Sequence, residues 1–251
     1  MIAFPNCKIN LGLHILDKRE DGYHNLQTVF FPIPWNDAIE IITDPSTTDI
    51  SIITSGNNIE GPSNNNLCVK AYHLLKKDFS ELPGIQLYLH KTIPTGAGMG
   101  GGSADGAFTI SLLNKKYDLG ISEEKLIDYA LQLGSDCPFF IIIKPCFASG
   151  RGEIMTPLPL SLKGYYILVI HPGIHVNTGW AFSQLDPDRI HEHSLREAIV
   201  RPIQTWKETI TNDFEKPVFS QYPEIAAIKE NLYTLGAVYA AMRGSGRTVF
   251  G

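Results

Sequence analysis

The stretch PTGAGMGGGSADGA, residues 94–107, decides how this chain folds and what it binds. Six of its fourteen residues are glycine, and each ordered glycine loses more backbone entropy than alanine, by about 0.5–1 kcal/mol. Glycine permits positive φ and leaves backbone N–H groups uncovered. A glycine-rich loop that runs into a helix offers those donors, with the positive end of the helix dipole, to an anion. The stretch therefore predicts a site for phosphate groups.

Three interpretations of this loop compete. A Walker A loop needs a lysine after the last glycine, and Ser103-Ala104 stands there instead, so it is excluded. The spacing of Gly96, Gly98 and Gly101 fits GxGxxG, which with Asp118 downstream is typical of an NAD(P)-dependent oxidoreductase. However, Lys115-Lys116-Tyr117 before Asp118 indicates the end of a helix, not of a second parallel strand. A plain flexible connection is the third interpretation.

The rest of the chain mixes strands and helices without regular βαβ alternation, which favours the α+β class. Apolar alternation predicts strands over 8–16, 23–33, 39–42, 50–53, 85–89, 165–171 and 237–242. Helical spacing and caps predict helices over 67–77, 103–114, 123–133, 194–210 and 223–235. Prolines cluster between 145 and 159. We therefore expect an N-terminal nucleotide- and phosphate-binding lobe over 1–150 and a C-terminal substrate-binding lobe over 151–251.

Composition narrows the class of protein. The chain has 251 residues, 43% of them apolar and 19% charged, and a net charge of −5. That charge argues against nucleic acid as a partner, and no apolar run is long enough to span a membrane. The four cysteines form no CxxC pair, and no secretory signal opens the chain. These features predict a cytoplasmic protein.

Two segments outside the loop carry side chains suited to phosphate chemistry. Lys8 and Asn10 lie two apart on a predicted strand and share a face, which is either a solvated edge or a cation placed beside an anion. Asp136, in GSDCPFF, is either the N-cap of a short helix or a carboxylate directed at a ligand. Spacing alone does not decide between these alternatives.

Three further clusters are weaker signals. Asp21-Gly22-Tyr23-His24 is, taken alone, more often a tight turn than a site. His191-Glu192-His193 is typical of a solvated loop, since no further ligand cluster accompanies it and a metal site would need one. Gly244-Ser245-Gly246 is either a turn or a stretch of backbone packed against the phosphate loop.

Taken together, these motifs resemble those of the GHMP kinases. Their first motif is similar to residues 8–13, their second to 94–107, and their third to 241–250. KINLGLHILDKREDGYHNLQTVF, residues 8–30, and GSDCPFF, residues 134–140, resemble the branch that acts on a cytidine diphosphate-linked methylerythritol. The resemblance covers essentially the whole chain. It implies a two-lobed α+β fold with the active site in the cleft between the lobes.

The resemblance also implies an activity. The expected reaction is transfer of the ATP γ-phosphate to the 2-hydroxyl of that small-molecule substrate, in the methylerythritol phosphate (non-mevalonate) route to isoprenoid and terpenoid precursors. We expect ATP and Mg²⁺ as cofactors and a monomer or weak homodimer. The alternatives are an NAD(P)-dependent oxidoreductase and a nucleotide-binding protein without catalysis. A measurement of ADP release with and without the diphosphocytidyl substrate distinguishes the kinase from these two alternatives, because only the kinase should release ADP when that substrate is present.

Residue roles follow from the same resemblance. Asp136 matches the catalytic base and Lys8 its partner. The residues that match substrate contacts are Asn10, Tyr23, His24, Thr178 and Phe182. The residues expected to bind ATP are Asn66, Lys91, Pro94, Thr95, Gly96, Ala97, Gly98, Met99, Gly100, Gly101, Gly102 and Ser103. Magnesium is expected to arrive with ATP, near Ser103, without a dedicated protein site.

Two departures from the family pattern stand out. Arg243 and Arg247 flank the glycines of the third motif, where small residues are usual. Relatives of the family usually continue beyond Val249-Phe250, so the C-terminal lobe is expected to be shorter than theirs.

Overall fold

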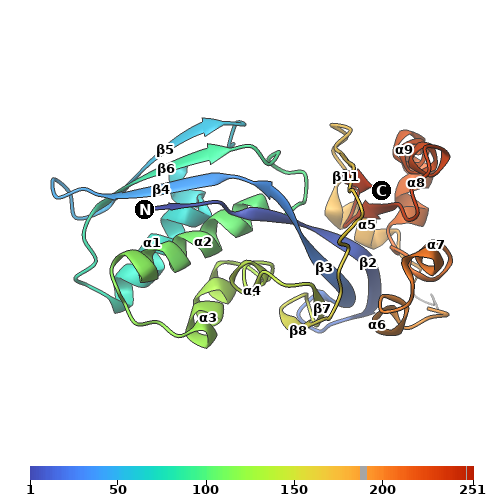
Figure 1. Cartoon of the computed structure of the whole chain (residues 1–251), viewed down its shortest axis with the longest axis horizontal. Coiled ribbons are helices and arrows are strands. Elements are labelled where there is room, and N and C mark those ends of the chain that lie inside the picture. Colours follow the sequence, from blue (N-terminus) through green and yellow to red (C-terminus); the bar gives the residue numbers. More distant parts are fainter. Residues whose placement is uncertain (187–190, 247) are drawn as a thin grey trace. The chain divides into compact units, whose positions relative to one another are not determined.

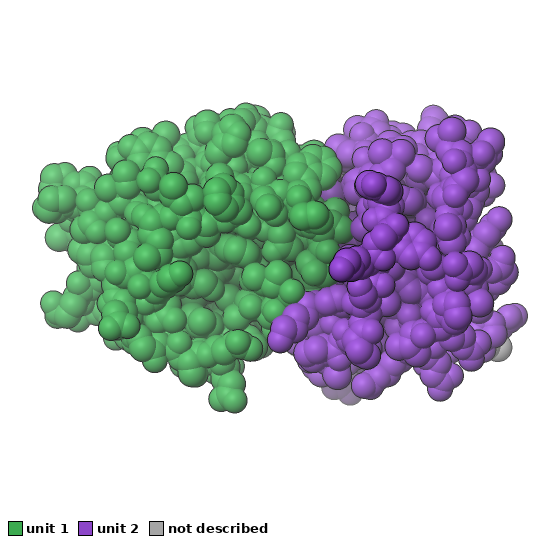
Figure 2. Space-filling view, viewed as in Figure 1, with its two compact units in different colours: residues 1–8, 32–95, 100–143 green, residues 9–31, 96–99, 144–251 purple. Residues whose placement is uncertain are grey.

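The computed structural model of the chain describes residues 1–186, 191–246 and 248–251, which form two compact units (Figure 2). Unit 1 comprises residues 1–8, 32–95 and 100–143, and unit 2 comprises 9–31, 96–99 and 144–251. Each unit is assembled from separate segments, because the chain passes from one to the other along two strands and again inside the glycine-rich loop. The assignment of nucleotide and substrate to lobes 1–150 and 151–251 stays a prediction.

Unit 1 is built on a four-stranded sheet of order β1-β4-β6-β5. Its strands are β1 (Ile2–Ala3), β4 (Ala38–Thr43), β5 (Ile50–Gly56) and β6 (Ile85–Lys91). β6 pairs antiparallel with β4 and parallel with β5. Ile85, Leu87 and Leu89 alternate along β6 and are buried, as the period of a half-buried strand requires. The lysine that ends this strand leads directly into the glycine-rich loop.

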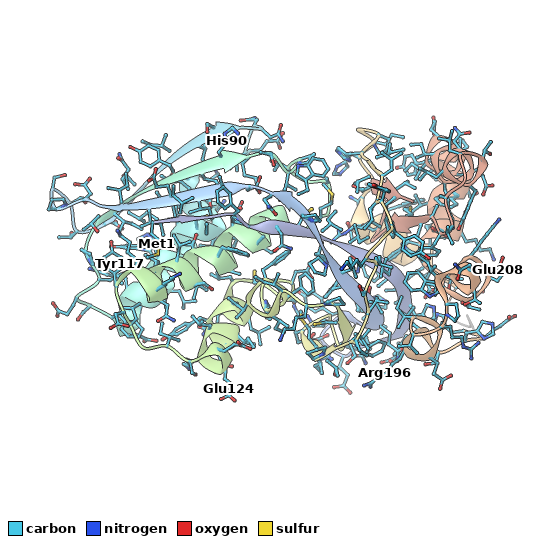
Figure 3. All side chains as sticks on the ribbon, viewed as in Figure 1. Met1, His90, Tyr117, Glu124, Arg196 and Glu208 are labelled. Carbon is cyan, nitrogen blue, oxygen red and sulfur yellow. The ribbon has the colours of Figure 1, made fainter. Side chains whose placement is uncertain are left out.

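The helical segments of unit 1 are, in chain order, η1 (Ser63–Asn65), α1 (Leu67–Asp78), α2 (Gly101–Lys116), α3 (Glu123–Leu133) and α4 (Phe139–Ile142). Helices α1 and α2 pack on one face of that sheet, and α3 and α4 pack against them (Figure 1). A Cβ on Gly106 of α2 would lie 2.9 Å from Leu67 Cβ, so the small residue lets α1 and α2 approach closely. Ser122 caps α3 through the Lys125 N–H, as predicted. Tyr117, labelled in Figure 3, ends α2 and places its hydroxyl 2.9 Å from that of Thr43.

Unit 2 contains most of a second four-stranded sheet and a three-stranded sheet. One has the order β2-β3-β7-β8, with β2 (Asn6–Lys18), β3 (His24–Asn36), β7 (Cys146–Ser149) and β8 (Ile154–Pro157), and the first residues of β2 and the last of β3 belong to unit 1. The other has the order β10-β11-β9, with β9 (Val169–Ile170), β10 (Ala241–Arg243) and β11 (Thr248–Phe250).

Short helices complete unit 2. They are α5 (Thr178–Ser183), α6 (Leu195–Ala198), η2 (Ile203–Thr205), α7 (Trp206–Thr209), α8 (Glu215–Gln221) and α9 (Pro223–Thr234). An apolar core that includes Ile15, Val176 and Phe214 lies between α5, α8, α9 and the second sheet. Among the residues described, no helix combines the length and the apolarity needed to cross a bilayer.

The α+β class is confirmed, and so are most predicted elements of unit 1. Three predictions in unit 2 were too long. The helix expected over 194–210 is broken into α6, η2 and α7, because Pro202 lacks an N–H and interrupts the helical hydrogen bonds. The strands expected over 165–171 and 237–242 are reduced to β9 and β10.

Candidate active site

Lys8 and Asp136, the two predicted catalytic residues, form an ion pair in unit 1. Lys8 Nζ lies 3.1 Å from Asp136 Oδ2, and the lysine side chain is 2% exposed whereas the aspartate side chain is 36% exposed. Burying an ammonium group is strongly unfavourable unless a carboxylate pairs with it. The exposed carboxylate makes this pair suited to meet a ligand, which a fully buried pair is not.

The turn between α3 and α4 directs Asp136 toward the lysine. Cys137 N donates to Gly134 O at 3.1 Å, and Phe139 N donates to Asp136 O at 3.3 Å. The residue at the N-cap of α4 is Pro138, and the helix has no side-chain cap. The N-cap interpretation of Asp136 is therefore wrong. The structure pairs its carboxylate with Lys8, and the interpretation in which that carboxylate is directed at a ligand stays a prediction.

The glycine-rich loop enters α2 at Gly100, which has a left-handed conformation with φ 76°. A Cβ at Gly100 would lie 2.7 Å from Phe140 Cζ and 3.5 Å from Lys8 Cγ, so only glycine fits here. The first helical bond runs from Ala104 N to Gly100 O at 2.8 Å, and no side chain caps the helix. The N–H groups of residues 101–103 precede that bond, beside the stem of Lys8. They form the uncapped start of a sixteen-residue helix, which is suited to bind an anion.

Ser103 connects this helix end to the turn that carries Asp136. Burial raises the pKa of the Cys137 thiol to about 11, although a hydrogen bond with Ser103 opposes that effect. The thiol is therefore neutral near pH 7 and is not a nucleophile. A Cβ at the neighbouring Gly102 would meet no atom within 4 Å, so this face of the helix end has room for a ligand.

Residues 96–99 of the loop lie in unit 2, where the third predicted motif holds them. Thr248 Oγ1 donates to Ala97 O at 2.8 Å. A Cβ on Gly98 would lie 2.4 Å from a guanidinium nitrogen of Arg243, so the arginine lies against this glycine, which has φ 77°. Arg243 is thus a packing neighbour of the loop. Arg247 lies outside the described residues.

The predicted substrate residues of unit 2 fall into three separate contacts. The rings of His24 and Phe182 stack with centroids 4.7 Å apart and an interplanar angle of 19°. The Arg151 guanidinium lies 3.9 Å from the centroid of the Tyr23 ring, which is 54% exposed. Thr178 Oγ1 lies 3.0 Å from Ser245 Oγ. The structure therefore brings His24 and Phe182 together and places Tyr23 under an arginine that the sequence did not single out.

The remaining predicted contacts are engaged within the protein. Asn10 Nδ2 donates to Thr28 Oγ1 at 2.7 Å, and that hydroxyl donates to Gly12 O at 2.6 Å. Asn66 caps α1 by accepting from Cys68 N at 2.9 Å. Thr95 Oγ1 donates to Asn58 O at 2.8 Å. Each of these side chains therefore stabilises a loop, a strand or a helix end of the protein itself. Their contacts with a ligand stay predictions.

Lys91 is the predicted ATP residue whose surroundings were least expected. Its Nζ donates to Asp37 Oδ2 and, at 2.7 Å, to Asp105 Oδ2. Burial alone would lower the pKa of Lys91, but the charges and hydrogen bonds of Asp105 and Asp37 outweigh it and raise this pKa. Burial raises the pKa of Asp105 to about 7, against the pull of Lys91. No local pattern in the sequence pairs Asp37, Lys91 and Asp105, which lie in separate segments of the chain.

His191, from the weak metal motif, is also paired with a carboxylate. Its Nε2 lies 3.0 Å from Asp213 Oδ2, and its ring stacks on that of His14 at 4.0 Å. Within residues 1–186, 191–246 and 248–251, no group of three His, Cys, Asp or Glu side chains is arranged to hold a metal ion.

Comparison with known proteins places this site in a family. The family profile described as "GHMP kinases N terminal domain" matches residues 66–142, and "GHMP kinases C terminal" matches 194–251. A protein of Bacteroides fragilis named 4-diphosphocytidyl-2-C-methyl-D-erythritol kinase is 55% identical over 100% of this chain and 91% of its own length. The chain belongs to the GHMP kinase family.

Three further similarities concern the fold and the branch of the family. A protein of the same name from Cytophaga hutchinsonii is 48% identical over 100% of this chain and 92% of its own length. A crystal structure of 4-(cytidine 5'-diphospho)-2C-methyl-D-erythritol kinase superposes with a TM-score of 0.84 at 30% identity, covering 100% of this chain and 89% of that one. The fold is shared with L. major mevalonate kinase, whose crystal structure superposes with a TM-score of 0.72 at 16% identity. The match covers 100% of this chain and 86% of that one.

The dinucleotide alternative is not supported by this structure. Asp118 has φ 50° and directly follows Tyr117, the C-cap of α2, and the chain then continues into α3. A dinucleotide fold requires a parallel strand after the first helix, with the acidic residue at its end. The helix end predicted before Asp118 is confirmed, and family membership implies the use of ATP.

Proposed function

We propose that this protein transfers the γ-phosphoryl group of ATP to the 2-hydroxyl of 4-diphosphocytidyl-2-C-methyl-D-erythritol. The relatives named above carry that kinase name over essentially this whole chain. The observation that carries the proposal is the Lys8–Asp136 pair. In this pair a buried ammonium holds a carboxylate that is 36% exposed, and the stem of Lys8 lies beside Gly100 at the start of α2. The reaction belongs to the non-mevalonate supply of isoprenoid precursors.

The chemistry requires mainly positioning and charge stabilisation, because the transition state of phosphoryl transfer is loose. Asp136 orients the acceptor hydroxyl and takes its proton as the phosphoryl group arrives. Lys8 pairs with that carboxylate and stabilises the negative charge that moves through the site. The N–H groups of residues 101–103 bind phosphate oxygens, and the glycines of 96–102 let the backbone approach them.

The residues of unit 1 fit ATP and a magnesium ion. The helix end at Gly100 offers donors without a side-chain cap, and Gly102 leaves open space above them. The Ser103 hydroxyl would supply a hard oxygen donor of the kind that Mg²⁺ prefers, with the ion arriving with ATP. When bound with ATP, magnesium neutralises charge on the phosphates. On the substrate side, we propose that the stacked pair His24 and Phe182 receives the cytosine ring, with Tyr23, Thr178 and Asn10 as neighbouring contacts.

ADP release tests this proposal. ATP should be consumed in the presence of the diphosphocytidyl substrate, and much less with R-mevalonate or homoserine as the acceptor. Binding of ATP without turnover on any of the three acceptors would support the alternative of a nucleotide-binding protein that lacks catalysis. Turnover that is equal with mevalonate would contradict the proposed substrate while leaving the family unchanged.

A further inference from the structure

Three charged residues of unit 1, Asp37, Lys91 and Asp105, form a buried cluster that the ATP contact expected of Lys91 does not explain. We call them the lysine–aspartate cluster. Lys91 ends β6, Asp105 is the fifth residue of α2, and Asp37 lies between β3 and β4. Their exposed fractions are 4%, 2% and 0%. The cluster therefore joins the segment before the glycine-rich loop to the helix that follows it.

On the side of β6, the cluster fixes the backbone that leads into the loop. Asp37 Oδ1 accepts from Thr92 N at 2.6 Å and from Ile93 N at 2.9 Å. The other oxygen of the same carboxylate accepts from Lys91 Nζ. The last residue of β6 and the two residues after it are thus tied to one fully buried side chain, so the start of the loop has little freedom.

On the side of α2, the same ammonium fixes the beginning of the helix. Lys91 Nζ donates to Asp105 Oδ2 at 2.7 Å. A Cβ on Gly101, the first residue of α2, would lie 3.2 Å from Lys91 Nζ, so the ammonium lies directly against the helix end. The two ends of the loop are therefore held by one side chain.

The charge balance of the cluster is unfavourable for stability alone. Two carboxylates share one ammonium, and no donor among the described residues lies within hydrogen-bond distance of Asp105 Oδ1. A buried carboxylate oxygen without a partner is costly, and buried ion networks are often no more stable than apolar replacements. An arrangement that is poor for stability and located at the phosphate loop indicates a role in function.

We propose that the lysine–aspartate cluster is a clamp that sets the spacing between the end of β6 and the start of α2, and thereby positions the loop for the phosphates of ATP. The proposal rests on the proposed function. Lys91, Asp37 and Asp105 act as positioning residues, since they reach the nucleotide through the backbone of the loop. Phosphoryl transfer depends on such positioning, and a displacement of about 1 Å can lower the rate about 100-fold.

Substitution of Asp105 separates a clamp from a structural ion pair. In Asp105→Ala, Lys91 keeps Asp37 as its partner, so the ammonium stays paired and the excess carboxylate is removed. The melting temperature should stay the same or rise. The KM for ATP should rise by about 10- to 100-fold, while the KM for the acceptor substrate changes by less than about threefold. Asp105→Asn keeps an oxygen that accepts from Lys91 and should restore the KM for ATP to within about threefold of the wild type.

Tyr129→Phe is the matched control. It removes the hydrogen bond from Tyr129 to Asp78, elsewhere in unit 1, and should lower the melting temperature without changing the KM for ATP. An unchanged KM for ATP in Asp105→Ala would overturn the clamp, and so would an equal loss in Asp105→Asn. If the wild type released no ADP with the diphosphocytidyl substrate, the proposed function would fail instead, and direct titration of the variants with ATP would still test the clamp.

Discussion

Unit 1 contains two buried lysines, Lys8 and Lys91, which solve the same electrostatic problem differently. Both are nearly inaccessible to solvent, at 1% and 4% exposed. Lys91 pairs with Asp37 and Asp105, whose side chains are 0% and 4% exposed. Lys8 pairs with Asp136, whose side chain is 36% exposed. A buried lysine alone therefore does not identify a site, and the exposure of its partner distinguishes a pair that can meet a ligand from one that cannot.

The difference assigns distinct tasks to the two lysines. Lys8 lies beside the end of α2 with its charge shared by a carboxylate that solvent reaches, which suits a pair that handles a proton and a phosphoryl group. Lys91 lies against the same helix end from inside, with its ammonium enclosed by carboxylates. The first pair is proposed to act on substrates, and the cluster around the second to hold the loop.

The largest effect is expected from breaking the exposed pair. Asp136→Asn preserves the size of the side chain but removes the charge and the basic oxygen. We expect kcat to fall by about 10²–10⁴, the usual range for loss of a general base. Steady-state ADP release with saturating ATP and acceptor measures this effect. A kcat within threefold of the wild type would remove Asp136 from its proposed role.

Two single variants, Lys91→Met and Lys8→Met, test whether the exposure of the partner carboxylate determines how much each lysine contributes to the free energy of unfolding. Lys91→Met leaves two buried carboxylates without their ammonium, so the free energy of unfolding should fall by about 3–5 kcal/mol. Lys8→Met leaves a carboxylate that water reaches, and it should be destabilised by less than about 1 kcal/mol while losing activity. Urea denaturation of both variants provides the two values. Equal destabilisation would mean that partner exposure does not separate the two lysines.

His14 in unit 2 is a buried basic side chain that is kept neutral, in contrast to the two charged lysines of unit 1. The pKa of His14 is lowered to about 4, mainly by burial and also by the charge of His191, against the pull of Asp213. Because the folded pKa lies below the unfolded value of 6.5, the unfolded state binds the extra proton first. The contribution of His14 to the free energy of unfolding is therefore fully present above about pH 6.5. It falls by about 2–3 kcal/mol as the pH decreases toward about 4.

His14→Gln is the variant that measures this contribution. Its free energy of unfolding should fall less steeply than that of the wild type between pH 6.5 and 4. Parallel curves would show that another group is responsible for the acid dependence.

The smallest effect concerns Gly102 at the helix end that both lysines flank. A Cβ there meets no protein atom within 4 Å, so Gly102→Ala should fold normally and gain up to about 1 kcal/mol from helix propensity. The same methyl group intrudes on the proposed phosphate space, and the KM for ATP should rise by about 5- to 30-fold. Thermal melting and initial rates measure the two effects separately. Gly98→Ala is a useful contrast, because its Cβ would clash with Arg243 and its φ is positive.

Much of this fold could be predicted from the sequence where local signals are strong. Alternation along β6, the small residues of α2 and the cap at Ser122 are features of neighbouring residues, and the structure bears them out. The break at Pro202 was visible in the sequence but was outweighed by the helical spacing around it. The short strands β9 and β10 depend on pairing with β11, which no local pattern specifies.

The candidate site was predictable in its motifs and not in its internal contacts. Lys8 and Asp136 are 128 positions apart, and only the family resemblance joined them before the structure placed them 3.1 Å apart. The lysine–aspartate cluster was missed because its members come from three separate segments. Asp105 lies within the glycine-rich motif at residues 94–107, but no local pattern pairs it with Lys91 or Asp37. The one available signal was Asp105, an acidic residue just inside the first turns of a helix that was expected to bind anions. Arg151 over Tyr23 was missed for the same reason.

Phosphorus NMR of the reaction product tests the central claim most directly. The protein is incubated with ATP, magnesium and 4-diphosphocytidyl-2-C-methyl-D-erythritol, and the site of the new phosphate is determined. The account predicts ADP in equal amount to a new phosphomonoester on the 2-hydroxyl, and about 10²–10⁴-fold slower product formation with Asp136→Asn. Inorganic phosphate in place of the phosphomonoester, or an unchanged rate in Asp136→Asn, would contradict it.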